Sequence, residues 1–469
     1  MPATKIVATI GPASRSPKTL EALVKAGAGV FRLNFSHGTH PEHLEVIKRV
    51  RRISRRLGKS VAVLQDLQGP KIRIGEIAGD GVLLRAGQEF TLTTEQITGD
   101  SGRASVSYKG LPGDASPGDT LLLSDGALEL TILELDESTI QCRVVIGGPL
   151  SSHKGINLPD SSIRAPSLTK KDREDMKFGI SNGVDYMALS FIRSAKEVKI
   201  ARKYLKERGS TIPLIAKIEK HEALDSIDAI IHEVDGVMVA RGDLGVEIPL
   251  EKIPMIQKML ISKTRQAGKP VITATQMLRS MVDSPRPTRA EVTDVANAIL
   301  DGTDAVMLSE ESAVGAYPVE AVSMMSKIAA DTEAHPDCSG RERTAPLGKS
   351  ISESVAYAAC ELAESIGAAA IITFTKSGRT ARLVAKYRPR ACILAPTPVE
   401  ETHRQLALTW GVTPILCSSS KDTDGMIRQI LETARDSRLV KKGQRVVITA
   451  GVPVWIKGST NMIKAAVLE

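Results

Sequence analysis

The sequence predicts an α/β protein: a TIM (β/α)8 barrel with an inserted all-β lid domain and a C-terminal α/β regulatory domain. Eight short apolar runs alternate with amphipathic segments, which is the pattern of the strand and helix units of such a barrel. A long stretch of period-two alternation interrupts this pattern after the third unit. A second series of helical and strand-like segments follows a polar stretch that contains two prolines.

The eight apolar runs are each too short for a helix and end abruptly in polar residues, as buried parallel strands do. They cover Lys5 to Gly11, Val30 to Phe35, Val61 to Leu67, Val184 to Phe191, Pro213 to Glu219, Gly236 to Asp243, Pro270 to Met277 and Asp304 to Glu310. Helical patterns lie between several of them, at Ser16 to Ala26, Glu42 to Leu57 and Glu251 to Ala267. Polar side chains follow nearly every run, at the strand ends where barrel enzymes carry their active sites.

The lid is predicted at residues 71–166, where alternating strands are separated by Gly, Pro and Asp turns. The barrel then comprises residues 1–70 and 167–335. Because the insertion leaves from the C-terminal end of the third strand, we expect it to overhang the active-site face and to close over it, excluding water. An inert decoration is the alternative.

A separate α/β domain is predicted at residues 336–469, after the polar stretch from His335 to Pro346. Its loop TKSGRT joins a strand to the start of a helix and carries hydroxyls, glycine and cations. The loop is a candidate site for the phosphate of an effector, with ordinary helix capping as the alternative. Its residues are Thr375, Lys376, Ser377, Gly378, Arg379 and Thr380.

The composition favours small anionic ligands. The net charge is +8 and the pI about 9.1, but only 3% of residues are aromatic, so phosphorylated metabolites fit better than nucleic acid. No apolar run reaches the ~20 residues needed to cross a bilayer, and we expect no membrane association. The five cysteines lack CxxC spacing, which argues against a zinc site or a disulfide framework and for a cytoplasmic protein.

Charged pairs at two adjacent strand ends are the strongest candidates for a site. Lys217 and Glu219 are two residues apart, as are Arg241 and Asp243, so each pair points to one side of its predicted strand. The glycine turn that follows, Gly242 to Gly245, can offer backbone N–H groups to a small anion. The set suits a divalent cation that holds a phosphorylated carboxylic acid. Two ion pairs that merely cap strands are the alternative.

Long motifs carry a family resemblance along the whole chain. They are TKIVATIGPAS at Thr4 to Ser14, FRLNFSHG at Phe31 to Gly38, GPKIRIG at Gly69 to Gly75, KGINLP at Lys154 to Pro159, IAKIE at Ile215 to Glu219, VMVARGDLGVEIP at Val237 to Pro249, ATQMLRSM at Ala274 to Met281, and the segment from Ser284 to Pro318. With these motifs the chain resembles the pyruvate kinase family, bacterial type. The resemblance implies transfer of the phosphoryl group of phosphoenolpyruvate to ADP, giving pyruvate and ATP in the last step of glycolysis, by a homotetramer.

The resemblance also implies roles for individual residues. Glu219 and Asp243 would hold Mg²⁺, with Mn²⁺ as a possible substitute. Lys217 would neutralise the moving phosphoryl group and the enolate oxygen. The remaining roles are carboxylate binding by Gly242, Asp243 and Thr275, phosphoryl binding by Arg32, nucleotide binding by Asn34, Phe35, Ser36, His37, Arg73 and Lys154, and protonation of the enolate by way of Thr275 and Ser309.

One substitution sets this chain apart within the family. Many members need K⁺, held by groups that match Asn34, Ser36, Asp66 and the Leu67 carbonyl, and those members carry Glu where this chain has Lys71. The lysine charge stands in for the cation, so the chain resembles the potassium-independent branch, and we expect K⁺ not to be required. A lysine that points to solvent is the alternative.

Two further departures concern the relay and the effector. The family's frequent SGET is SEES here, so Glu310 follows Ser309 in place of glycine. The segment GVPVWIKGSTN lacks the Gly-Trp-Arg-Pro typical of members activated by fructose 1,6-bisphosphate, so a different phosphorylated sugar or a nucleoside monophosphate is the expected effector. A metal-dependent lyase or aldolase acting on phosphoenolpyruvate or pyruvate, and a non-catalytic binding protein, are the rival functions.

Overall fold

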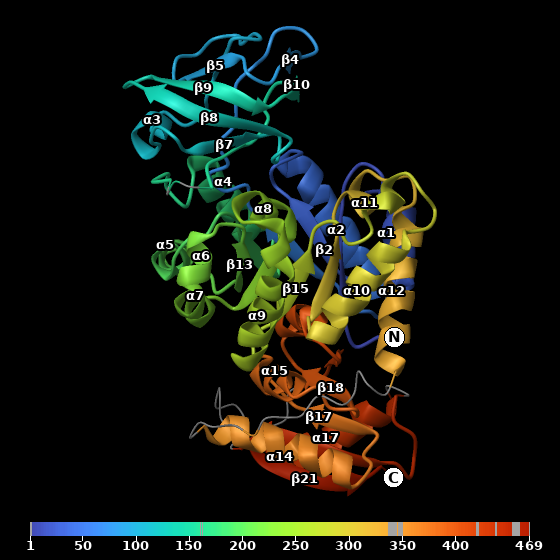
Figure 1. The fold of residues 1–469 in the computed structure, drawn as a ribbon. Helices are drawn as coiled ribbons and strands as arrows, with labels where there is room; N and C mark the ends of the chain where they lie inside the picture. The colour runs from blue at the N-terminus through green and yellow to red at the C-terminus, as the bar shows by residue number, and fades with distance from the viewer. Residues whose placement is uncertain are drawn as a thin grey trace.

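In the computed structural model the chain forms three bodies in a row, with the lid above the barrel and the C-terminal domain below it (Figure 1). The structure describes residues 2–159, 161, 163–335, 345, 350–418, 422–436, 439–452 and 460–468. Most of the predicted linker, Cys338 and residues 453–459 of the C-terminal motif lie outside the described residues.

The barrel predicted from the sequence is confirmed as a closed ring of parallel strands. In ring order the strands are β1 (Lys5–Thr9), β16 (Ala305–Leu308), β15 (Val271–Ala274), β14 (Gly236–Ala240), β13 (Leu214–Ile218), β12 (Tyr186–Leu189), β3 (Ala62–Asp66) and β2 (Ala28–Asn34). Seven of the strands are shorter than the apolar runs that predicted them, because residues at the ends of those runs belong to the adjoining loops or helices, whereas β2 begins two residues before its predicted run.

One local prediction was wrong. Arg241 and Asp243 were expected on one side of a strand, but β14 ends at Ala240 and both residues lie in helix α8 (Arg241–Glu247). The run ARGDLG contains no β-branched residue, and a helix places the two side chains on different faces.

Helices follow the strands and cover the outside of the barrel (Figure 1). Three of them begin with a capping box, at Thr39, Thr169 and Thr288, each with an acidic residue three positions later that returns a hydrogen bond. The helices of this domain are α1 (Pro17–Ala26), α2 (His40–Leu57), α4 (Lys170–Ser181), α5 (Ala195–Lys206), α6 (Glu222–Asp225), α7 (Ile227–Glu233), α8, η1 (Leu250–Lys252), α9 (Ile253–Gln266), η2 (Arg279–Val282), α10 (Arg289–Asp301), α11 (Glu310–Ala313) and α12 (Pro318–Ala334).

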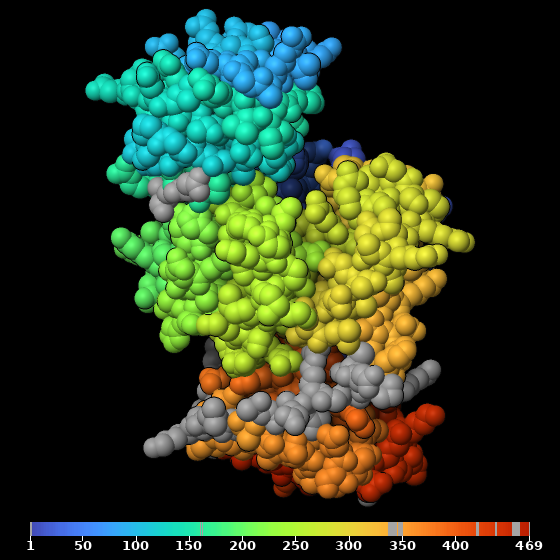
Figure 2. Space-filling view, in the orientation of Figure 1, coloured from blue at the N-terminus to red at the C-terminus, as the bar shows by residue number. Residues whose placement is uncertain are grey.

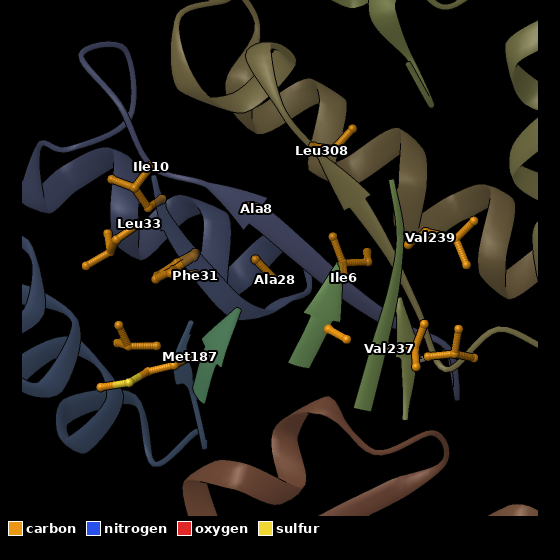
Figure 3. Packing of buried hydrophobic residues seen from close by; sticks show 14 of the residues in the cluster. Ile6, Ala8, Ile10, Ala28, Phe31, Leu33, Met187, Val237, Val239 and Leu308 are labelled. Carbon is orange, nitrogen blue, oxygen red and sulfur yellow. The ribbon is translucent and has the colours of Figure 1, made fainter. Parts of the chain in front are cut away.

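The barrel strands alternate between two apolar layers. Ile6, Ala8 and Phe31 face outward and pack under the helices (Figure 3). Val7 and Val30, which alternate with these residues along their strands, belong to a second cluster of buried residues. This cluster also includes Ala407 and Leu408 of helix η3 (Leu406–Leu408) in the C-terminal domain. The period-two alternation thus fills the barrel interior and holds its strands rigid beneath the site.

The lid is a mainly antiparallel body with its own core, in which β5 and β6 pair in parallel, and it rests on one end of the barrel (Figure 2). Its main sheet has the order β11-β7-β8-β9-β5-β6, and β10 pairs with β4. The elements are β4 (Val82–Leu84), β5 (Glu89–Thr93), β6 (Arg103–Ser105), α3 (Leu111–Asp114), β7 (Thr120–Leu123), β8 (Leu128–Leu135), β9 (Thr139–Ile146), β10 (Gly148–Leu150) and β11 (Ile156–Asn157).

The C-terminal domain is a five-stranded sheet with helices on both faces. Its strand order is β19-β18-β17-β20-β21, and β21 alone runs antiparallel among the described strands. The elements are α14 (Ile351–Ser365), β17 (Ala370–Thr373), α15 (Arg379–Lys386), β18 (Cys392–Thr397), α16 (Glu400–Gln405), η3, β19 (Val412–Leu416), α17 (Thr423–Asp436), β20 (Arg445–Gly451) and β21 (Thr460–Val467).

Buried ion pairs join this domain to the barrel. Arg404 Nε donates to Asp185 Oδ1 at 2.7 Å, and Arg388 pairs with Asp304 at 3.0 Å. None of the described helices is long and apolar enough to cross a membrane.

Candidate active site

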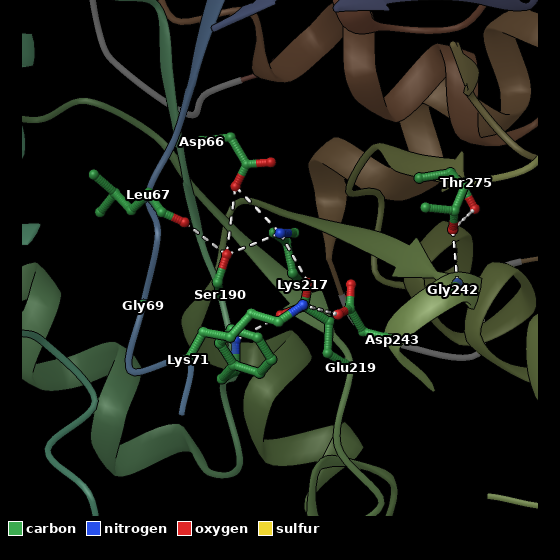
Figure 4. Close-up of polar contacts among 12 residues, drawn as sticks. Asp66, Leu67, Gly69, Lys71, Ser190, Lys217, Glu219, Gly242, Asp243 and Thr275 are labelled. Atoms are coloured by element: carbon green, nitrogen blue, oxygen red, sulfur yellow. Dashed lines mark hydrogen bonds and ion pairs between the residues drawn. The ribbon is translucent and has the colours of Figure 1, made fainter. Parts of the chain in front are cut away.

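The Lys217 ammonium is the centre of the polar cluster at the C-terminal end of the barrel (Figure 4). It donates to Ser190 Oγ at 2.8 Å and lies 2.8 Å from Glu219 Oε1 and 3.3 Å from Asp66 Oδ1. Strand β13 supplies the lysine, and Glu219 follows the strand by one residue. Three neighbouring strands therefore converge their polar ends on one ammonium group.

The charges of this cluster hold one another in place. Burial alone would raise the pKa of the Asp66 carboxyl, but Lys217 and Arg32 offset burial and leave the pKa below its ordinary value. Burial opposes the charge of Lys217 too, yet Asp66 and Glu219 raise the pKa of the ammonium well above its usual range. Lys217 is therefore a fixed cation, suited to stabilising negative charge and not to exchanging protons.

Glu219 and Asp243 are the two carboxylates with spare acceptor capacity near Lys217. Glu219 Oε2 accepts from the Phe191 backbone N–H at 2.7 Å, whereas Oε1 is buried and pairs with Lys217 Nζ at 2.8 Å. Burial, with the nearby Asp243 charge, raises the pKa of Glu219 in spite of Lys217. An added cation would relieve both burial and repulsion, and carboxylate oxygens are the ligands that Mg²⁺ prefers.

Lys71 pairs with one of these two carboxylates, Asp243, and with a carboxylate of the lid. Its ammonium is 3.3 Å from Asp243 Oδ1 and 3.3 Å from Asp125 Oδ1, which belongs to the turn between lid strands β7 and β8. Burial lowers the pKa of Lys71, but the Asp243 and Asp125 carboxylates raise it and leave it above its ordinary value. Lys71 is a cation that bridges the lid and the barrel.

Thr275 and Gly242 form a second, smaller centre (Figure 4). The Gly242 N–H donates to Thr275 Oγ1 at 2.8 Å, at the first turn of α8. Thr275 has φ +70° and Gln276 has φ +54°, conformations that residues with a side chain adopt at a cost. The strain turns the Thr275 hydroxyl toward α8 directly after β15.

Arg32 and Ser309 lie at the ends of two other barrel strands. Arg32 donates from Nε to Asp66 Oδ2 at 2.6 Å and from a terminal nitrogen to Thr9 Oγ1 at 3.0 Å. Ser309 Oγ is buried and has no hydrogen-bond partner. Glu310, which replaces the family's glycine, is exposed and pairs with Arg279 at 3.1 Å.

The family resemblance assigns nucleotide binding to residues from two places. One group follows β2, and the other lies where the chain enters and leaves the lid. Asn34 Oδ1 accepts from the Ser36 N–H at 3.1 Å, and Phe35 is buried with its ring stacked 4.1 Å from His43. His37 and Lys154 are exposed, and Arg73 donates to the His153 carbonyl at 2.9 Å. The Phe35 side chain is part of the core, so only its backbone can face a ligand.

Sequence reasoning missed several residues of the cluster. Ser190 lies in the predicted run from Val184 to Phe191 and was given no role, although it accepts from Lys217 and donates to the Leu67 carbonyl at 2.7 Å. Glu311 accepts from the Ser309 N–H at 2.7 Å and holds that turn. Asp125 carries no local signal of a role, because only the folding of the lid brings it to Lys71.

The candidate effector loop lies in the C-terminal domain, away from this cluster. Gly378 has φ +77° and precedes α15, and Arg382 donates to the Ser377 carbonyl at 2.7 Å. Thr375 and Thr380 are buried, and Thr380 Oγ1 lies 2.7 Å from Thr460 Oγ1 on β21. Lys376 and Arg379 are exposed cations at the loop surface.

Comparisons with known proteins agree with this architecture. Residues 1–322 match the family described as "Pyruvate kinase, barrel domain", and residues 353–466 match "Pyruvate kinase, alpha/beta domain". Pyruvate kinase 2 of Synechocystis sp. is 47% identical, covering 99% of this chain and 79% of its own length. Pyruvate kinase of Clostridium acetobutylicum is 46% identical over the full length of both chains.

A solved structure shows the same arrangement. The crystal structure of a pyruvate kinase from Cryptosporidium parvum superposes with a TM-score of 0.92 at 38% identity, covering 100% of this chain and 96% of that one. Family models and relatives both span the barrel and the C-terminal domain, and the chain belongs to the pyruvate kinase family.

Proposed function

We propose that the chain transfers the phosphoryl group of phosphoenolpyruvate to ADP in a Mg²⁺-dependent reaction that yields pyruvate and ATP. The observation that carries this proposal is the Lys217 ammonium held between Ser190, Asp66 and Glu219 with the Asp243 carboxylate beside it. A fixed cation next to two carboxylates with spare oxygens suits a substrate that carries both a phosphoryl group and a carboxylate.

Glu219 and Asp243 would hold the metal ion, and the burial of Glu219 beside the Asp243 charge, which a cation would offset, supports that assignment. When bound, Mg²⁺ supplies positive charge to the oxygens of the substrate and the phosphoryl group. Lys217 would carry the charge of the phosphoryl group as its bond to the enolate oxygen breaks and a bond to an ADP oxygen forms. Arg32, fixed by Asp66 and Thr9, would face the phosphoryl group from the other side.

The enolate that remains must take a proton at carbon to become pyruvate. Thr275, oriented by its strained backbone, and Ser309, whose buried hydroxyl has no partner, would carry that proton by way of water. The Gly242 and Asp243 backbone, with Thr275, would bind the substrate carboxylate. Asn34, Phe35, Ser36, His37, Arg73 and Lys154 would line the nucleotide site.

We assign each body of the chain one task in this reaction. Residues 1–70 with 167–335 would form the catalytic barrel, 71–166 the lid and 336–469 the regulatory domain, which would bind a phosphorylated sugar or a nucleoside monophosphate at Thr375 to Thr380. A cytoplasmic homotetramer would be the working form. Four cysteines of the described chain are free, which supports a reducing compartment.

An assay coupled to lactate dehydrogenase tests the reaction. We expect NADH consumption only when phosphoenolpyruvate, ADP and a divalent cation are all present, with loss of activity in chelator and recovery with Mg²⁺ and partly with Mn²⁺. Full activity in chelator would refute the metal assignment. Pyruvate formation without ATP would point to a different reaction at the same barrel.

A further inference from the structure

A second cluster of metal-binding side chains lies just past the end of β13. His221, Glu222 and Glu247 each offer one ligand atom, and these atoms all lie within 4.8 Å of one another. His221 Nδ1 is 3.5 Å from Glu222 Oε2 and 3.6 Å from Glu247 Oε2. The cluster is separate from Lys217 and from the carboxylate pair assigned to Mg²⁺.

The polar atoms of this cluster are buried without hydrogen bonds. His221 Nδ1, both carboxylate oxygens of Glu222, and Glu247 Oε2 are shielded from solvent and have no hydrogen-bond partner. The Glu247 side chain is completely buried, and its other oxygen already accepts from Lys220 Nζ and Asn157 Nδ2, each at 2.7 Å. Burying a carboxylate oxygen without a hydrogen bond destabilises the folded protein, and a bound cation would offset that free-energy cost.

The two separations from His221 Nδ1 are too long for hydrogen bonds but suit a tetrahedral metal site. An N–H···O bond spans about 2.7–3.2 Å. Zinc bonds of about 2.0–2.1 Å to nitrogen and carboxylate oxygen place neighbouring ligands of a tetrahedron about 3.3–3.4 Å apart. The His221 nitrogen lies 3.5 and 3.6 Å from its two carboxylate partners, close to that edge.

We propose that His221 Nδ1, Glu222 Oε2 and Glu247 Oε2 form a second divalent-metal site, for a transition ion of the Zn²⁺ class. One imidazole and two carboxylates favour such an ion over Mg²⁺, which prefers oxygen ligands and octahedral geometry. Three protein ligands leave a fourth position for water.

A metal at this site would hold in place the two segments that carry Glu219 and Asp243. His221 and Glu222 follow Glu219 by two and three residues, and Glu247 lies one helical turn after Asp243 on α8. A metal there ties the segment after β13 to the end of α8, and so fixes the two segments that carry the catalytic carboxylates. Through Asn157, Glu247 also holds the lid strand β11.

Cobalt binding to the full-length protein, stripped of metal with a chelator, tests the site. Tetrahedral Co²⁺ absorbs strongly in the visible range, whereas octahedral Co²⁺ at an all-oxygen site absorbs weakly, so the spectrum separates the two metal sites. We expect the Glu219→Gln/Asp243→Asn double variant to keep one Co²⁺ with the strong band. His221→Asn and Glu222→Gln should each lose the band, and the affinity for Co²⁺ should fall by more than the about 10- to 100-fold that loss of an outer-sphere partner costs.

The variants are chosen to remain folded. His221 and Glu222 are partly exposed, so replacing them should not disrupt the core. His232→Asn, at an exposed histidine on α7, is the matched control and should keep the band. Zn²⁺ should also raise the melting temperature of the double variant but not of the double variant carrying His221→Asn. No strong band in wild type, or equal bands in wild type, His221→Asn and Glu222→Gln, would overturn the proposal.

Discussion

Lys71, at the start of the lid, and Asp243, on barrel helix α8, form an ion pair 3.3 Å long. The same ammonium lies 3.3 Å from Asp125 in the lid, so one lysine links the lid to a carboxylate proposed to hold Mg²⁺. The space for this lysine comes from Gly155, where a Cβ atom would come within 2.9 Å of Lys71 Cε.

The first prediction is that the enzyme needs Mg²⁺ but not K⁺. The Lys71 ammonium already places a positive charge beside Asp243, and a monovalent cation nearby would be repelled. We expect kcat to change by less than about tenfold, ~1.4 kcal/mol of barrier, between tetramethylammonium and potassium salts. Lys71→Glu should gain at least partial dependence on K⁺.

Gly155→Ala is a second variant that tests whether the position of the Lys71 ammonium removes the need for K⁺. It keeps the lysine but displaces the end of its side chain, so activation by K⁺ should appear in this variant too, and less than in Lys71→Glu. A wild-type kcat that falls more than about tenfold when K⁺ is withheld would contradict the proposal.

A second prediction concerns Asp125. Its side chain is 71% exposed, so its ion pair with Lys71 should contribute at most about 1 kcal/mol. Asp125→Asn should raise KM for the substrates by no more than about fivefold, which corresponds to that energy, and leave the melting temperature unchanged. Asp80→Asn, at an exposed lid aspartate, is the control. An unchanged KM at low ionic strength would show that the pair does not favour closure of the lid.

How far the sequence predicts this site depends on whether the signal is local. Lys217 and Glu219 are close in sequence and straddle a strand end, so alternation alone brings them together at 2.8 Å. Arg241 and Asp243 show the same spacing, but period two applies only to strands, and here a helix begins at Arg241. The spacing cannot tell which rule applies, since the end of a buried strand has no marker of its own.

Contacts between residues far apart in the chain could not be predicted from local sequence patterns. The strand β21 was not predicted, because Thr460–Val467 contains Lys, Met and two alanines and acquires its strand form by pairing with β20. Asp125 is likewise ordinary in the sequence. The eight-strand ring, by contrast, follows from repeated local patterns, which is why the barrel could be predicted.

A third prediction tests the centre of the site. Lys217→Met removes the fixed cation that Asp66 and Glu219 hold in place, so kcat should fall at least ~10²-fold, as when a preorganised electrostatic donor is lost. KM for phosphoenolpyruvate should change less. Lys206→Met, at an exposed lysine on α5, should behave as wild type. Near-normal turnover of Lys217→Met, in protein with an unchanged circular dichroism spectrum, would remove Lys217 from the catalytic role.

A fourth prediction addresses regulation. A phosphorylated sugar or a nucleoside monophosphate bound at Thr375 to Thr380 should lower the half-saturating concentration of phosphoenolpyruvate, with a coupling of ~1 to 3 kcal/mol. Ser377→Glu places a negative charge in the loop and should abolish the response without lowering maximal activity. Ser354→Glu, on the exposed face of α14, is the control. If no such compound shifts the saturation curve of the wild type, the loop serves only to cap α15.

The last prediction concerns Lys5, where the barrel meets the C-terminal domain. Its ammonium donates to the Val412 carbonyl at 2.8 Å, and burial, opposed by Glu333 and Asp304, lowers its pKa to about 8. The folded-state pKa lies below the unfolded one, so between pH 8 and the ordinary lysine pKa of 10.5 the unfolded chain holds a proton that the folded chain has released. The free energy of unfolding therefore rises with pH across this window, by at most about 3 kcal/mol from this group.

Lys5→Met isolates that contribution, because it removes the titrating group and leaves the other ionisable side chains unchanged. Melting temperatures measured at pH 7.5 and 9.5 should show the wild type gaining stability relative to Lys5→Met as the pH rises. The gain should saturate above the unfolded-state pKa, where Lys5 is neutral in both states. Parallel changes in the two proteins would mean that Lys5 keeps an ordinary pKa in the folded chain and that water reaches its ammonium at the domain junction.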